Sequence, residues 1–108
     1  MLYTHWDHDV HQDHQAIGKA SLTAGRKLYR LLMYRSNLYQ SSMPFNENFF
    51  VDISNFIDLK MRSVAAHETE VRKFGPEWLN FWKQEAMTNG IRCGTKYAEV
   101  FQIVKFLT

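Results

Sequence analysis

The sequence predicts an α/β fold of about four strands and three helices, built as a single domain over residues 1–108. Segments with strand-like and helix-like patterns alternate along the chain. The last apolar run, residues 97–106, is hydrophobic on both faces, which is typical of a strand buried in a sheet. Hydrophobic residues make up 45% of the chain and aromatic residues 15%, so there is enough apolar surface for one packed core.

The N-terminal elements are a short strand and a helix. Residues 2–4 are β-prone and lead directly into a His/Asp-rich loop. From about Asp13 the pattern becomes helical, and Asp13 is expected to cap the helix because its carboxylate can accept free backbone N–H groups. Gly25 is expected to end it. The predicted apolar stripe of this helix is Ile17, Ala20, Ala24 and Leu28.

Two more strands and a long loop follow. Residues 28–34 form an apolar run that predicts a buried strand. Residues 35–46 are rich in Ser, Asn and Pro and read as a loop of a length that is often functional. Residues 49–53 predict the next strand.

The second half of the chain predicts two helices and the final strand. Ser54 is expected to cap a helix that runs to about Glu70 and carries His67 near its end. After a connector, Pro76 is expected to start another helix, which Asn89-Gly90 ends. The strand over residues 97–106 then closes the domain.

Composition and charge restrict the partners and the compartment. Thirteen basic and eleven acidic residues are interspersed and give a formal net charge of +2, so no basic patch indicates nucleic-acid binding. The single cysteine, Cys93, excludes an internal disulfide and fits a reducing compartment. Neither a signal peptide nor an apolar run of membrane-spanning length is apparent, so we expect a cytoplasmic protein with no membrane partner.

Four of the five histidines lie within ten positions, and the densest stretch is Asp9-Val10-His11-Gln12-Asp13-His14. Imidazole and carboxylate groups are the usual ligands of zinc, and a second carboxylate can orient a ligating ring through its other nitrogen. His11 and His14 are three residues apart, so helical geometry could place them on one face. The same composition also suits a solvated polar loop whose Asp caps the helix, and spacing alone leaves both interpretations open.

The residues also resemble a known family. Segment 4–21, with its Asp-x-His-x-Asp-His-x-Ala-x-Gly core, resembles the second conserved motif of the LmbE-like (PIG-L) metal-dependent N-deacetylases. The stretch 49–54, the Ala-His pair ending at His67, and Tyr-Ala-Glu-Val-Phe at 97–101 are similar to later patches of that family, in the same order. The resemblance covers most of this chain but only the C-terminal part of the family's domain.

The resemblance implies a partial Rossmann-like layer with a mixed sheet, and a function in removing acetyl groups from N-acetylglucosaminyl-type amides. It implies that His14 is a zinc ligand and that His11 polarises the reacting carbonyl. It implies that Asp9 and Asp13 orient these rings. The family's His-Pro-Asp-Asp-Glu run, which supplies two ligands and the base, does not occur here. We therefore expect a truncated relative that is inactive or weakly active alone and binds zinc weakly.

Two further hypotheses follow from the truncation. Without the N-terminal strands, a central strand would become an exposed edge, which favours pairing with another chain. We therefore expect a homo-oligomer, most simply a dimer, and a non-catalytic assembly module is the alternative function. In a third hypothesis, oligomerisation gathers histidines of two chains into a new metal site, using His5, His8, His11 and His14.

Overall fold

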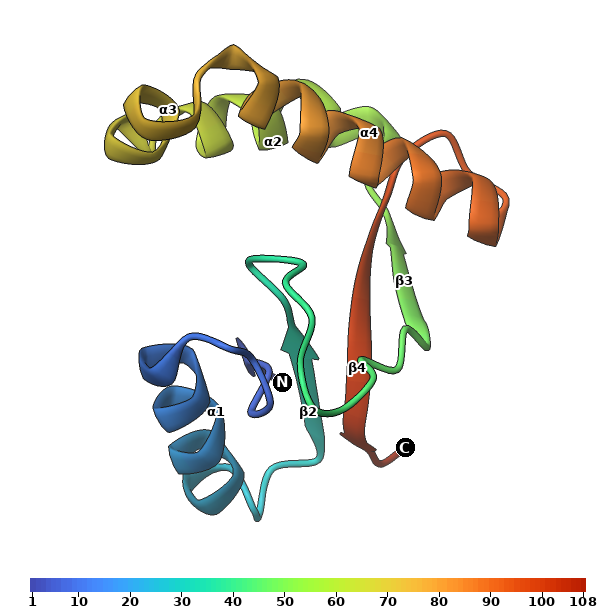
Figure 1. Ribbon diagram of the computed structural model, residues 1–108. Coiled ribbons are helices and arrows are strands. Elements are labelled where there is room, and N and C mark those ends of the chain that lie inside the picture. Colours follow the sequence, from blue (N-terminus) through green and yellow to red (C-terminus); the bar gives the residue numbers. More distant parts are fainter. The chain divides into compact units, whose positions relative to one another are not determined.

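The computed structural model describes all 108 residues and contains a four-stranded sheet with four α-helices (Figure 1). The prediction of an α/β fold with a mixed sheet is confirmed, with one helix more than expected. In chain order the elements are β1 (Leu2–His5), α1 (Gln12–Ala24), β2 (Arg30–Tyr34), β3 (Phe49–Asp52), a 3₁₀ turn η1 (Ser54–Phe56), α2 (Ile57–Ala65), α3 (Glu68–Phe74), α4 (Pro76–Cys93) and β4 (Ala98–Phe106).

The strands are ordered β1-β2-β4-β3 in the sheet. β1 and β2 are parallel, and His5 at the end of β1 lies opposite Tyr34 at the end of β2. β4 runs antiparallel to β2, with Arg30 opposite Phe106. Because β1 and β2 run in the same direction, the segments that follow them leave the sheet at the same end, beyond the carboxyl ends of both strands.

The chain divides into two compact units, which are described separately. The N-terminal unit comprises Met1–Phe49 and Val100–Thr108, and the helical unit comprises Phe50–Glu99. The chain therefore passes between the units inside β3 and inside β4, and no linker separates them.

The N-terminal unit places α1 against β1 through a glycine. A Cβ atom at Gly18 would lie 2.6 Å from the His5 carbonyl oxygen and 2.8 Å from Asp7 Cα, so only glycine allows this approach. Leu22, one turn further along α1, packs on the hydrophobic core of this unit. The buried residues of that core are Trp6, Leu31 and Met33, and Leu2, Leu22 and Phe45 pack against them.

Two expectations for α1 are wrong and one is confirmed. The N-cap is His11 rather than Asp13, because His11 Nδ1 accepts the Asp13 backbone N–H. The predicted stripe does not face the core, since Ile17 is 51% exposed and Gly18 is the buried residue. Periodicity located a helix, but the close approach at Gly18 decides which face is buried. Gly25 ends the helix as predicted.

The helical unit has its own core of Ile53, Ala86 and Tyr97. Ser54 does not cap α2 as expected: it begins η1, and its hydroxyl donates to Asp52 Oδ1 at 2.6 Å. The Ser54 hydroxyl and the Ser54 backbone N–H both donate to the exposed Asp52 carboxylate, and these two hydrogen bonds lower the pKa of that group. The helix expected to reach Glu70 instead ends at Ala65.

The remaining helix boundaries also differ from the prediction. A separate helix, α3, starts after His67, which therefore lies in the short connection between the end of α2 and the start of α3. Acidic residues in its first turn favour that start. Pro76 opens α4 as predicted, but α4 continues through Gly90 to Cys93. Gly90 is required by packing, since its Cβ would lie 2.6 Å from the Lys96 carbonyl oxygen, and Gly94, at φ +90°, is the left-handed cap. No helix has the length and apolar character needed to cross a membrane.

Replacing Gly18 tests the packing of α1 on β1. We expect Gly18→Ala to lower the free energy of unfolding by about 1 to 3 kcal/mol, because the added methyl group meets backbone atoms that cannot rotate away. Lys19→Ala, on the exposed neighbouring position, is the matched control and should change stability by less than about 0.5 kcal/mol. Urea unfolding followed by circular dichroism measures both, and equal stabilities would contradict the contact.

Candidate functional site

The candidate site lies where β1 and β2 end. The chain leaves β1 into the loop that precedes α1, and it leaves β2 into the loop that precedes β3. Ligands of open α/β sheets bind beyond the carboxyl ends of parallel strands, because loops from neighbouring strands converge there. Both loops belong to the N-terminal unit.

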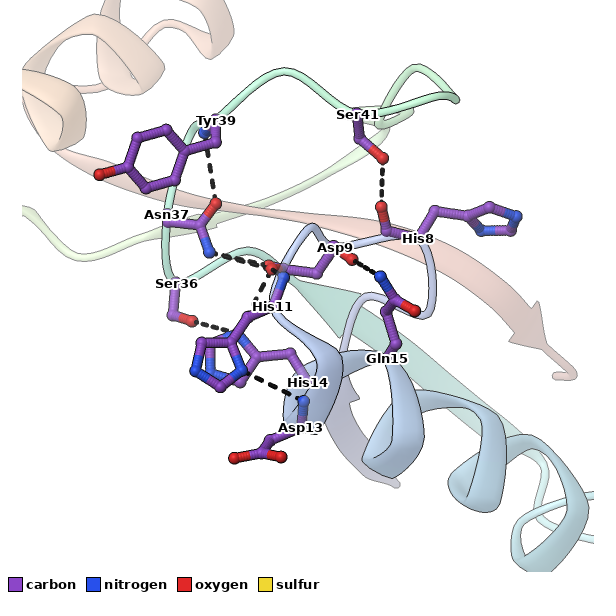
Figure 2. Close-up of polar contacts among 10 residues, drawn as sticks. All are labelled: His8, Asp9, His11, Asp13, His14, Gln15, Ser36, Asn37, Tyr39 and Ser41. Carbon is purple, nitrogen blue, oxygen red and sulfur yellow. Dashed lines mark hydrogen bonds and ion pairs between the residues drawn. The ribbon is translucent and has the colours of Figure 1, made fainter.

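Asp9 is the centre of the site. Its side chain is only 1% exposed. Its Oδ1 accepts the His11 backbone N–H at 2.8 Å and Asn37 Nδ2 at 3.0 Å. Asn37 Nδ2 also lies 3.2 Å from Oδ2, so one amide group spans both carboxylate oxygens (Figure 2). The Asp9 carbonyl oxygen accepts Gln15 Nε2 at 2.6 Å, which attaches the loop to the first turn of α1.

These contacts also set the charge of Asp9. Burial alone would raise the pKa of its carboxyl group, but the hydrogen bonds from the His11 N–H and Asn37, together with the nearby His14 ring, lower it. The balance is a pKa below the usual value. Asp9 is therefore an ionised carboxylate at neutral pH.

Three imidazole rings stack beside this carboxylate. His14 lies in the middle, with its ring centroid 4.1 Å from that of His5 and 4.4 Å from that of His11. The ring planes differ by 5° and 19°, respectively. Asp9 Oδ1 lies 3.5 Å from His14 Nδ1, and Ser36 Oγ lies 3.3 Å from the same nitrogen. The stacked rings of His5 and His11 fix the plane of the His14 ring. The contacts of His14 Nδ1 with Asp9 and Ser36 fix the rotation of the ring within that plane.

The hydrogen-bond partners assign opposite tautomers to the two motif histidines. His11 Nδ1 accepts the Asp13 backbone N–H at 3.1 Å, so its lone pair is used there and the neutral ring carries its proton on Nε2. His14 Nδ1 faces the Asp9 carboxylate, which favours a proton on Nδ1 and leaves the lone pair on Nε2. In these tautomers His11 presents an N–H donor at Nε2 and His14 presents a free imidazole lone pair at Nε2.

The remaining residues of the cluster occupy different positions. The Asp13 side chain is exposed and points away from the rings, and its contact with His11 is through the backbone (Figure 2). The His8 ring is directed away from His11 and His14 and lies 3.2 Å from Asp7 Oδ1 (Figure 2). His5 Nδ1 is buried without a hydrogen-bond partner, and burial, followed by the proximity of His14, lowers the pKa of this ring. Of the two aspartates in the motif, Asp9 is therefore the one whose carboxylate contacts an imidazole ring, whereas Asp13 contacts one only through its backbone N–H.

Among the residues of the cluster, the imidazole groups have the chemistry of zinc ligands. No three His, Cys, Asp or Glu side chains converge in a way that could hold a metal ion. A catalytic zinc site normally takes three protein ligands. His14 Nε2 has the chemistry of one such ligand, and the Asp9 carboxylate at its Nδ1 suits the group that orients it.

Sequence reasoning missed the residues that hold Asp9 in place. Asn37 and Ser36 follow β2 and contact Asp9 and His14, respectively. The only signal for them was the length of the loop over residues 35–46. Had β1 and β2 been recognised as parallel neighbours, the polar residues directly after β2 would have been the first candidates.

Removing the Asp9 carboxylate should be costly. We expect Asp9→Ala to lower the free energy of unfolding by about 3 kcal/mol, because it leaves two part-buried donors, the His11 N–H and the Asn37 amide, without their acceptor. Asp13→Ala is the control and should cost about 0.3 to 1 kcal/mol, which is the value of an acidic residue in the first turn of a helix. Denaturant unfolding separates the two, and a loss no larger for Asp9 than for Asp13 would refute the central role of Asp9.

Comparison with known proteins adds a structural relative. No protein-family model and no curated protein matches the chain. Among solved structures, the chain is similar to the crystal structure of the conserved protein TT1542 from Thermus thermophilus, with 27% sequence identity and a TM-score of 0.78. The match covers 98% of this chain and 52% of TT1542, so the chain spans about half the length of that protein.

Proposed function

We propose that the N-terminal unit carries one half of a zinc-dependent N-deacetylase site of the LmbE/PIG-L type. Its substrates would be N-acetylglucosaminyl-type amides, and the chain alone would have little or no activity. The observation that carries this proposal is the placement of the His11 and His14 ring nitrogens: Nδ1 of His11 faces the Asp13 backbone N–H and Nδ1 of His14 faces the Asp9 carboxylate, which favours opposite tautomers. A metal-assisted amide hydrolase needs both a ligand and a donor for the carbonyl oxygen, and this pair offers them side by side.

Each residue has a distinct role in the proposal. His14 would ligate zinc through Nε2, with Asp9 accepting from its Nδ1–H. His11 would donate its Nε2–H to the carbonyl oxygen of the substrate amide as negative charge develops there. Asp13 would act only through its backbone N–H, which keeps the His11 proton on Nε2. When bound, zinc would supply Lewis-acid polarisation of the carbonyl and an acidified water.

The exposed apolar surface supports association as part of this proposal. β1 is an edge strand of the sheet. Exposed apolar side chains occur on these elements: Tyr3 on β1 is 47% exposed, Ile17 on α1 is 51% exposed, and Met1, which precedes β1, is 56% exposed. Open sheet edges with apolar side chains favour pairing with another chain. We propose that two copies associate on this surface, and the same surface favours the alternative of a non-catalytic assembly module.

The exposed free thiol of Cys93 supports placing the protein in the reducing cytoplasm.

Zinc binding and turnover test the deacetylase proposal. We expect the untagged protein to bind zinc weakly in calorimetry, His14→Ala to abolish that binding, and His8→Ala to leave it unchanged, because His8 is directed away from the site. Any hydrolysis of an N-acetylglucosamine substrate should likewise be lost in His14→Ala.

Three other outcomes have definite meanings. Equal losses in His8→Ala and His14→Ala would indicate adventitious binding by a histidine-rich loop. Zinc binding without turnover would favour a metal site shared between chains, and the absence of both would leave the assembly module.

Sedimentation tests the association. We expect a dimer that dissociates when Ile17→Lys places a charge on the proposed surface. Phe81→Lys is the control, since Phe81 is 42% exposed but lies in the helical unit. A monomer at all concentrations, or equal effects of the two substitutions, would exclude pairing on β1 and α1.

A further inference from the structure

We infer that Asn37 is a positioning residue that sets which nitrogen of His14 carries the proton, acting through Asp9. The inference rests on the proposed function, because that function assigns the lone pair of His14 to a zinc ion. Its structural content, the tautomer of one ring, can be measured without metal or substrate.

The orientation of the Asn37 amide is determined by its own backbone contact. Asn37 Oδ1 accepts the Tyr39 backbone N–H at 3.2 Å (Figure 2). Because the oxygen of the amide is used in this way, the nitrogen must face Asp9, and it does so at 3.0 Å and 3.2 Å from the two carboxylate oxygens. A turn in the loop after β2 therefore points an N–H donor at a buried carboxylate that lies 28 positions earlier in the chain.

Asn37 in turn limits the rotation of the Asp9 carboxylate. The His11 backbone N–H binds Oδ1 only, and one such bond would allow the group to turn about it. The amide nitrogen of Asn37 lies near both oxygens and removes that freedom. Oδ1 is consequently held 3.5 Å from His14 Nδ1, where only a proton on Nδ1 makes the contact favourable.

A competing partner makes this control necessary. Ser36 Oγ lies 3.3 Å from the same His14 nitrogen, and a hydroxyl group can either donate or accept. If Asp9 moved away, Ser36 could donate to Nδ1, which would place the ring proton on Nε2 and remove the lone pair that a metal needs. Asp9, held by Asn37, decides this competition because a carboxylate can only accept.

The tautomer is measured by long-range proton–nitrogen NMR of protein labelled on histidine, at about pH 8, where free imidazole is neutral. We expect the wild-type His14 ring to carry its proton on Nδ1, and Asn37→Ala to produce a substantial Nε2–H population. Adding Ser36→Ala to Asn37→Ala should restore Nδ1–H, a rescue that simple loss of structure would not give. Asn46→Ala, an exposed position in the same loop, is the matched control and should leave His14 unchanged.

The outcomes separate this inference from the proposed function. An Nε2–H ring in the wild type, or an unchanged His14 in Asn37→Ala, overturns the inference, and the wild-type measurement stands even if the variant does not fold. If zinc binds, Asn37→Ala should weaken it by about tenfold, as loss of an outer partner does. If no zinc binds but the tautomer shifts as expected, the inference holds and the metal proposal fails.

Discussion

The burial of the Asp9 carboxylate is the constraint on which the rest of the site depends. A charged group that is almost completely removed from water must receive hydrogen bonds, or it would destabilise the fold by several kcal/mol. Its donors come from two loops that are far apart in the sequence, at His11 and Asn37. Satisfying one charge therefore brings together the loops that follow β1 and β2 and places His14 beside them.

The sheet supplies the frame for this arrangement. Because β1 and β2 pair in parallel, the loops that follow them lie at the same end of the sheet. The close approach of α1 at Gly18 places the start of that helix beside the end of β1. The helix start then uses His11 as its cap, so the capping bond and the orientation of the ring are one contact. Local helix chemistry and site geometry are in this way determined together.

Features with local causes could be predicted from the sequence, and features with tertiary causes could not. Gly25 and Pro76 mark helix boundaries for local reasons: the flexible backbone of glycine disfavours continuing a helix, and proline has a fixed φ that suits the first turn. Gly90 resembled a helix end, but it lies inside α4, where the Lys96 backbone leaves no room for a side chain. The apolar stripe containing Ile17 is likewise exposed for a tertiary reason, because the close approach of α1 to β1 occurs at Gly18.

The site shows the same division. The His/Asp cluster is contiguous in the sequence, so its density was visible directly. Asn37 lies 28 residues from its partner, and an Asn in a polar loop carries no signal of such a contact. Asn37, which we infer to control the tautomer of His14, reaches Asp9 only when β1 and β2 pair.

The double use of His11 bears on how sequences of this kind can diverge. Its Nδ1 caps α1, and Asn, Asp or Ser at this position would cap the helix equally well without an imidazole. A lineage that no longer needed the ring could therefore exchange His11 at little cost to folding, while loss of Asp9 would be selected against in active and inactive chains alike. Retention of His11 among close relatives would record selection for chemistry, whereas retention of Asp9 is expected from folding alone and would not distinguish active from inactive chains.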